Sequence, residues 1–174
     1  MTDTIQIRCL TTLGAREIEG LSDLLIDCVE GGASVSFMLP MTRAKADTFW
    51  RDTAASVARG ERLVFVAEDA GGIVGTAQII LAQPENQPHR ADLAKMLVHR
   101  RARKRGIGAA LLAAAERGAL AAGKTLLVLD TASDDAERLY ARHGWQRCGV
   151  IPDYALLPDG RPCATTYFFK FLRS

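Results

Sequence analysis

Apolar residues recur at helical spacing in the first third of the chain. From Ala15 to Glu30 they form a single stripe, made of Ile18, Leu21, Leu24, Leu25 and Cys28. The glycine pair at 31–32 ends this helix. A second helix is predicted from about Arg43 to Arg59, with Thr42 as its N-cap and Gly60 as its end.

Two further helices are predicted in the second half. One begins at Gly106, where a run of alanine and leucine has high helix propensity, and closes at Gly123. The other is short, is capped by Ser133 or Asp134, and extends to about Arg142.

Strand patterns fill most of the remaining chain. The predicted strands are Ile5–Leu10, Leu63–Ala67, Ile73–Leu81, Ala91–Val98, Thr125–Leu129, Trp145–Ile151 and Thr165–Phe171. The turn Asp69–Gly72 makes a hairpin of the second and third. In the fourth, alternation places Asp92, Ala94, Met96 and Val98 on one face. The segment from Pro152 to Cys163, with three prolines, reads as a long loop. The resulting order β-α-α-β-β-β-α-β-α-β-β predicts an α/β or α+β sheet protein, a single domain over residues 1–174.

Composition narrows the class of protein. The chain has 174 residues, 48% hydrophobic and 24% charged, with a net charge of +2 and only 6% aromatic residues. These values do not indicate a nucleic-acid-binding surface. No apolar run approaches a membrane span, and the N-terminus lacks the features of a secretory signal, so we expect a cytoplasmic protein. Four dispersed cysteines and three dispersed histidines predict neither disulfides nor a metal site.

The segment Arg103-Lys104-Arg105-Gly106-Ile107-Gly108 carries the most informative chemistry. Glycine permits positive φ and lets a ligand approach the main chain, and the following helix begins with unpaired N–H groups that attract phosphate. The flanking cations add phosphate donors. The dinucleotide and Walker fingerprints are absent. The alternative for the two glycines is a plain strand-to-helix turn. The alternatives for Arg100–Arg105 are a solvated charge run and a nucleic-acid-binding patch.

At this point the sequence resembles the GCN5-related N-acetyltransferase (GNAT) superfamily. Met96-Leu97-Val98, the Arg103–Gly108 segment and Leu111-Leu112 are similar to its central motif, and Thr131–Trp145 is similar to its next motif. A closer resemblance, to the tabtoxin-resistance branch that inactivates a β-lactam amino-acid toxin, rests on three further segments: Gly31–Val35, Leu129–Thr131 and Tyr154 with Pro158–Arg161.

The resemblance implies acetyl-CoA as acetyl donor and a mixed, mostly antiparallel sheet of about seven strands, splayed between the fourth and fifth and flanked by about four helices. The backbone of Met96, Leu97 and Val98 would bind the pantetheine arm like an added strand. The amides from Arg105 through Gly106 and Ile107 to Gly108 would hold the pyrophosphate, beside Arg103 and Lys104. Many relatives place a cofactor-binding asparagine where this chain has Ser133. Arg100 and Arg101 are candidates for the ribose 3′-phosphate on charge alone.

Acetyl transfer to an amine needs a base for the ammonium and an acid for the leaving thiolate. Tyr140 lies where the family places its general acid, and its alternative is a core tyrosine. Asp92 lies where members often place a general base, and Asp130 ends the fifth predicted strand across the expected gap. The alternative for Asp92 is solubility at a strand edge, and the alternative for Asp130 is a turn or capping role. His89 and His143 are further candidate bases by chemistry alone.

Acceptor recognition is expected in two segments. The small-residue loop containing Gly32, Ala33, Ser34 and Phe37 has backbone to offer a ligand, although it also suits a plain helix–helix turn. Tyr154 and Arg161 lie in the predicted 152–163 loop, where the arginine suits a substrate carboxylate or is plain surface charge.

The sequence thus favours acetylation of a primary amine on a small molecule, by direct attack on the thioester, in a monomer or homodimer. Acetylation of a protein N-terminus or lysine, and a non-catalytic acyl-CoA-binding domain, are the alternatives. We expect neither nucleic-acid nor membrane partners.

Overall fold

A computed structural model describes residues 4–173, which form seven strands, four α-helices and one turn of 3-10 helix. The strands are β1 (Gln6–Leu10), β2 (Arg62–Asp69), β3 (Gly72–Ile80), β4 (Arg90–Val98), β5 (Leu126–Thr131), β6 (Gln146–Leu156) and β7 (Pro162–Phe171). The helices are α1 (Ala15–Glu30), α2 (Arg43–Ala58), η1 (Arg100–Ala102), α3 (Ile107–Ala121) and α4 (Asp134–Arg142).

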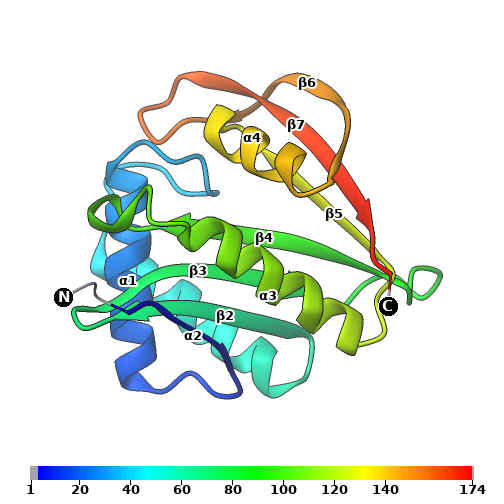
Figure 1. Ribbon diagram of the computed structural model, residues 1–174. Coiled ribbons are helices and arrows are strands. Elements are labelled where there is room, and N and C mark those ends of the chain that lie inside the picture. Colours follow the sequence, from blue (N-terminus) through cyan, green and yellow to red (C-terminus); the bar gives the residue numbers. More distant parts are fainter. Residues whose placement is uncertain (1–3, 174) are drawn as a thin grey trace.

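All seven strands belong to one sheet, in the order β1-β2-β3-β4-β5-β7-β6. Every neighbouring pair is antiparallel except β4 and β5, which are parallel. The two parallel strands pair only where Arg90–Asp92 faces Leu126–Val128. Beyond these residues they diverge, as Figure 1 shows. The predicted mixed, mostly antiparallel α/β sheet with a splayed centre is therefore confirmed.

Helices cover both faces of this sheet (Figure 1). On one face α3 and α4 pack in a core that includes Phe65, Leu111, Leu127 and Tyr140. On the other face α1 and α2 pack in a second core around Leu21, Leu25, Trp50 and Val64. Helix α3 lies very close to the sheet, because a Cβ on Gly118 would come within 2.5 Å of Phe65 Cζ.

Helix ends follow the predicted capping residues. Thr42 Oγ1 accepts a hydrogen bond from the Lys45 amide at 3.2 Å, at the start of α2. Ser133 Oγ accepts one from the Ala136 amide at 3.2 Å, at the start of α4. Both bonds satisfy amides that a helix leaves unpaired in its first turn.

The predicted alternation of β4 is wrong beyond Ala94. A β-bulge interrupts its pairing with β3, and Lys95 within the bulge has φ +52°. As a result Met96 and Val98 pack into the same core as Ala91 and Leu93, whereas Leu97 packs into the opposite core. Asp92 and Met96 therefore do not share a face, because the extra residue reverses the side-chain directions.

The predicted long loop from Pro152 to Cys163 is also wrong. Strand β6 continues to Leu156 and β7 begins at Pro162, so that only five residues, 157–161, connect them. The hairpin accommodates Pro152 because its register shifts between Ile151 and Ala155, where a proline needs no partner for its nitrogen.

Residues 4–173 contain neither a membrane-spanning helix nor a cluster of metal ligands. Between residues 4 and 173 no helix has both the length and the apolar composition that a membrane crossing requires. Within the same range no three His, Cys, Asp or Glu side chains gather as a metal-ligand set.

Candidate active site

The gap between β4 and β5 exposes backbone on both of its sides. Leu93, Leu97 and Val98 of β4 keep partners on β3 but have none on β5. Across the gap, residues 129–131 of β5 pair only with β7. An extended ligand has backbone hydrogen-bonding groups available here, as at the edge of a sheet.

The β4–α3 loop (residues 99–106) leads from this gap to a helix N-terminus. Lys104 and Gly106 both have positive φ, of +62° and +74°. The first hydrogen bond of α3 runs from the Ala110 amide to the Gly106 carbonyl at 3.1 Å. The amides of residues 107–109 precede that bond, so they are the unpaired donors that bind anions at a helix start. A Cβ on Gly106 would meet nothing within 4 Å, which leaves open space in front of the turn.

The cations of this loop divide into two groups. Arg101 and Arg105 contact the buried carboxylate of Asp69 at 2.7 and 3.2 Å, and Arg100 pairs with Asp27 at 2.9 Å. Arg103 and Lys104 are exposed and form no ion pair with any residue from 4 to 173. The first group fixes the loop, and the second is available to an external anion.

Asp69 anchors the loop from the β2–β3 turn. Its carboxylate also accepts a hydrogen bond from the Gly71 amide at 2.9 Å. The hydrogen bond from Arg101 is the main influence that lowers the pKa of Asp69, to about 2. The carboxylate is thus charged at every pH at which the protein would be assayed.

Tyr140 lies on α4 with its ring buried between Trp145 and Phe168, at centroid distances of 5.7 and 5.9 Å. Within residues 4–173 no hydrogen bond to its hydroxyl is found. Burial, followed by the negative charge of Asp130, raises the pKa of this phenol well above its ordinary value. The phenol is therefore protonated at neutral pH.

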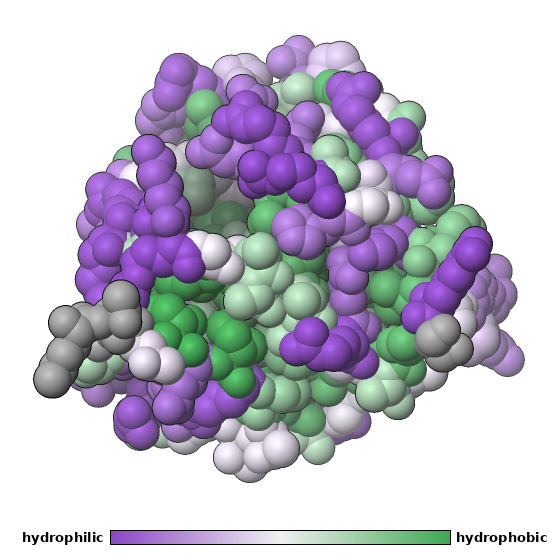
Figure 2. Space-filling model, viewed as in Figure 1, coloured by the Kyte–Doolittle hydropathy of each residue, from purple (hydrophilic) through white to green (hydrophobic). Residues whose placement is uncertain are grey.

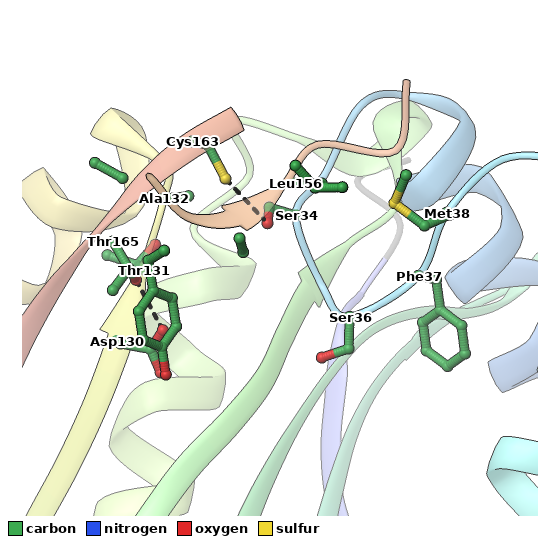
Figure 3. A pocket seen from close by; sticks show the side chains of 13 residues that line it. Ser34, Ser36, Phe37, Met38, Asp130, Thr131, Ala132, Leu156, Cys163 and Thr165 are labelled. Atoms are coloured by element: carbon green, nitrogen blue, oxygen red, sulfur yellow. Dashed lines mark hydrogen bonds between the residues drawn. The ribbon is translucent and has the colours of Figure 1, made fainter. Parts of the chain in front are cut away.

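A pocket of about 360 Å³ lies beyond the gap, on the α1–α2 side (Figure 3). Three segments form its wall. They are the α1–α2 loop with Ser34, Ser36, Phe37 and Met38; the end of β5 from Asp130 to Ala132; and the β6–β7 hairpin with Tyr154, Ala155, Leu156, Cys163, Ala164 and Thr165. The structure thus brings together Ser34, Phe37, Asp130 and Tyr154 from the predicted set.

The other predicted acceptor residues lie outside this wall. Gly32, with φ +93°, ends α1, and Ala33 packs against the core beneath α1 and α2. Arg161 sits in the β6–β7 turn, where it pairs with Asp159 at 2.7 Å. Ser133, which was expected to bind the cofactor, caps α4, so its hydroxyl oxygen already accepts a backbone hydrogen bond.

The two candidate carboxylates occupy different settings. Asp130 is exposed on the pocket wall and accepts a hydrogen bond from Thr165 Oγ1 at 2.7 Å. Asp92 forms an ion pair with Arg90 and accepts a hydrogen bond from Gln83 Nε2 at 3.0 Å. It registers with Val128, two residues before Asp130, so both carboxylates project from the α1–α2 face.

Sequence reasoning missed a tyrosine beside these carboxylates. Tyr167 registers with Asp130 on β7, and its hydroxyl lies 2.9 Å from that of Tyr154. The hydrogen bond with Tyr154 is the main influence that raises the pKa of Tyr167, to about 12. Its position opposite Asp130 depends on strand pairing between distant segments, which no local pattern reveals.

Comparison with known proteins identifies the family. A model of the acetyltransferase (GNAT) domain matches residues 60–147, which is half of the chain. The chain belongs to the GNAT family of acetyltransferases. A relative from Azospirillum brasilense, an uncharacterised N-acetyltransferase of the hisH–hisA intergenic region, is 30% identical over 132 residues, covering 75% of this chain and 76% of the relative.

Solved structures share the GNAT fold over almost the whole chain. A ribosomal-protein-alanine N-acetyltransferase from Brucella melitensis superposes with a TM-score of 0.78 at 24% identity, covering 96% of this chain and 99% of that one. A GNAT superfamily phosphinothricin acetyltransferase from Sinorhizobium meliloti, solved in complex with acetyl-CoA, gives 0.76 at 20% identity, covering 99% and 89%. At these identities the likeness establishes the fold.

The GNAT assignment accounts for the gap and the loop together. An acetyltransferase of this family takes its acetyl group from acetyl-CoA, which has an extended arm and a pyrophosphate. The unpaired edge of β4 fits the arm, and the start of α3 with Arg103 and Lys104 fits the phosphates. Figure 2 shows the surface hollowed between the upper and lower halves of the molecule, with hydrophilic side chains around the hollow.

Proposed function

We propose that this GNAT enzyme, acting as a single domain in a monomer or homodimer, acetylates the primary amine of a small molecule. The observation that carries the proposal is the closure of the pocket. The Leu39 amide donates a hydrogen bond of 3.0 Å to the Pro158 carbonyl, and Ser34 Oγ lies 3.6 Å from Cys163 Sγ. The α1–α2 loop is thereby joined to the β6–β7 hairpin, and the open groove that a peptide acceptor needs is bridged.

The acetyl donor would bind in the gap between β4 and β5 and at the β4–α3 loop. Acetyl-CoA, when bound, supplies the acetyl group as a thioester. The backbone of Met96, Leu97 and Val98 would hold its arm. The amides from Arg105 to Gly108, with the side chains of Arg103 and Lys104, would hold its phosphates. Arg100 and Arg101 serve the loop itself, because acidic partners already engage both.

On the acceptor side Asp130 is the better placed base. It lines the pocket and has one neutral hydrogen-bond donor, Thr165, whereas Asp92 is neutralised by Arg90. Asp130 would accept a proton from the acceptor ammonium, leaving a nucleophilic amine.

Tyr140 would protonate the departing thiolate. Its raised pKa keeps the phenol protonated, so its proton is available as negative charge develops on the departing sulfur. Its hydroxyl has no internal partner among residues 4–173 to compete for that proton. A direct transfer of this kind needs no covalent enzyme intermediate, so that none of the cysteines has to act as a nucleophile.

The acceptor class we favour is an amino-acid-like toxin, such as the β-lactam amino acid of the tabtoxin-resistance branch. The volume of about 360 Å³ suits a small molecule. Similarity to a phosphinothricin acetyltransferase supports the fold, and the acceptor itself rests on the sequence resemblance.

An amine screen tests the proposal. Release of free thiol from acetyl-CoA would be measured with single amines, α-amino acids, the β-lactam amino acid, and peptides bearing N-terminal alanine or internal lysine. We expect turnover with small amines and little with peptides. Turnover confined to peptides would overturn the small-molecule assignment. Tight CoA binding without turnover of any amine or peptide would favour a non-catalytic acyl-CoA-binding domain.

A further inference from the structure

Lys95 occupies an unusual position beside the acceptor pocket. It is the residue with φ +52° in the β4 bulge, where β4 has already parted from β5. Its ammonium donates a hydrogen bond of 3.3 Å to Ser36 Oγ and lies 5.5 Å from the centre of the Phe49 ring. Ser36 forms part of the pocket wall, so the charge of Lys95 lies against that wall.

The ammonium of Lys95 lacks a direct ion-pair partner within the part of the chain that the structure describes. None of the ion pairs formed by residues 4–173 includes Lys95. Burial lowers the pKa of Lys95, the positive charge of Arg62 lowers it further, and Asp130 raises it. A partly buried charge without an anionic partner is costly, and that cost is relieved when a ligand provides the anion.

Two N–H groups near Lys95 also lack hydrogen-bond acceptors. Arg62 Nη1 donates to Gln78 Oε1, yet Arg62 Nε and Gln78 Nε2 are buried without hydrogen-bond partners. Gln78 is fully buried and registers with Ala94, next to Lys95. Arg62, Gln78 and Lys95 thus place unsatisfied N–H donors and two positive charges on the α1–α2 face of the sheet.

Asp130 stands on the other side of the pocket from Ser36 (Figure 3). Asp130 on one wall can therefore bind the ammonium group of an acceptor. Lys95, behind Ser36 on the opposite wall, can bind its carboxylate group. We propose that Lys95 is a specificity-determining residue that binds the carboxylate of the acceptor, and that this enzyme selects amino acids over simple amines. The inference rests on the proposed function and names the residue that recognises the acid group of its acceptor.

Lys95 is better placed than Arg161 to meet a substrate carboxylate. Asp159 pairs with Arg161 in the β6–β7 turn, outside the pocket wall. Lys95 reaches the wall from β4, next to the backbone that would hold the acetyl donor. Its charge can therefore fix the orientation of an acceptor whose amine lies at Asp130.

Matched acceptors test the inference. Wild type and Lys95→Met would be assayed for thiol release with α-amino acids and with their carboxamides, which keep the amine and lose the acid. We expect wild type to prefer each acid. In Lys95→Met the ratio of kcat/KM for acid over carboxamide should fall at least about tenfold, mostly through KM, as expected for a lost charge-assisted contact. Lys95→Arg should keep much of the preference.

Two control variants separate this role from a structural one. Ser36→Ala removes the hydrogen bond to Lys95 but keeps its charge, and should keep the acid preference. Lys45→Met removes two hydrogen bonds, of 2.9 Å each, that hold the carbonyls of Met38 and Pro40 in the same α1–α2 loop. If Lys45→Met and Lys95→Met lower the turnover of acids and carboxamides alike, Lys95 acts by holding the loop and the inference is wrong.

A binding measurement distinguishes failure of the inference from failure of the proposed function. Titration calorimetry with the amino acids and carboxamides, in the presence of CoA, needs no turnover. Binding of acids that weakens in Lys95→Met supports the anion site even if no amine is acetylated. Turnover of carboxamides and simple amines with no preference for acids overturns the anion site and leaves the acetyltransferase proposal standing.

Discussion

The carboxylate of Asp69 and the guanidinium of Arg101 lie 2.7 Å apart, and this ion pair ties the β2–β3 turn to the β4–α3 loop. Arg105 reaches the same carboxylate at 3.2 Å, so two loop cations depend on one fully buried acid. The geometry of the phosphate-binding segment is consequently set by a residue more than thirty positions earlier in the chain.

Asp69→Asn removes the charge and keeps the size of the side chain. Because both arginines are partly exposed, we expect a modest loss of about 1–2 kcal/mol in the free energy of unfolding. We also expect weaker CoA binding, since the loop loses its anchor. Urea denaturation and titration calorimetry measure the two effects. Asp23→Asn, which breaks the exposed pair between Asp23 and Arg43, should change stability by less than about 0.5 kcal/mol.

The same carboxylate predicts a pH dependence. Its pKa of about 2 in the folded protein lies below the ordinary value of about 4 in an unfolded chain. Its contribution to stability is therefore complete above about pH 4 and is lost as the pH falls toward about 2. Urea midpoints measured between pH 6 and pH 3 should drop less in Asp69→Asn than in wild type. Parallel curves for the two proteins would contradict this assignment.

Gly108 tests whether the start of α3 holds phosphate. A Cβ at this position would lie 3.2 Å from Leu139 Cδ2, a contact that a small shift of the leucine relieves. Gly108→Asp places a negative charge in the first turn, which favours the helix but repels phosphate. We expect CoA affinity to fall more than tenfold in Gly108→Asp, and much less in Gly108→Ala, by calorimetry. Equal affinities in the two variants would rule out the phosphate site.

Tyr140→Phe removes one hydroxyl and leaves the ring packing with Trp145 and Phe168 unchanged. We expect kcat to fall by about 10²–10⁴-fold, the usual range for loss of a general acid. The melting temperature and the CoA affinity should stay close to wild type. Because the pKa of Tyr140 is raised, wild-type activity should show no alkaline decline from this residue up to about pH 10. Full thiol release by Tyr140→Phe would refute the assignment.

Asp130 and Asp92 make a matched pair of carboxylates. Asp130→Asn should lower kcat/KM by about 10²-fold or more, since it removes the base from the pocket wall. Asp92→Asn should have a smaller effect, because Arg90 already neutralises that carboxylate. Steady-state kinetics with one accepted amine would compare them. A larger loss in Asp92→Asn would reverse the two roles.

Local signals in the sequence predicted the helices well. Helix α1 has its predicted bounds, Ala15–Glu30, because a continuous apolar stripe ends at a glycine pair. Helix α4 begins after Ser133 because that side chain caps it. Family motifs, which also depend on local residue types, predicted the gap between β4 and β5 and the β4–α3 loop. They also predicted which elements carry Asp130 and Tyr140.

The sequence did not predict features that depend on pairing between strands distant in the chain. Lys95 looks like an ordinary strand residue, and only its failure to pair regularly with β3 reveals the bulge that turns it toward Ser36. The three residues of β6 between Ile151 and Ala155 form a second irregularity, in which Asp153 has φ +50° and Tyr154 reaches the pocket. Prolines at 152 and 162 suggested a loop, but a distorted hairpin tolerates them.

The short contact between β4 and β5 has a consequence for the cohesion of the whole molecule. Three registered residue pairs are all that joins β1–β4 to β5–β7–β6 within the sheet. A ligand lying along β4 would take the place of an eighth strand, between β4 and β5, that the chain itself does not provide. Its binding would then raise the free energy of unfolding and couple the two parts of the sheet. Saturating CoA should accordingly slow hydrogen exchange in strands on both sides of the gap, including amides that no ligand touches.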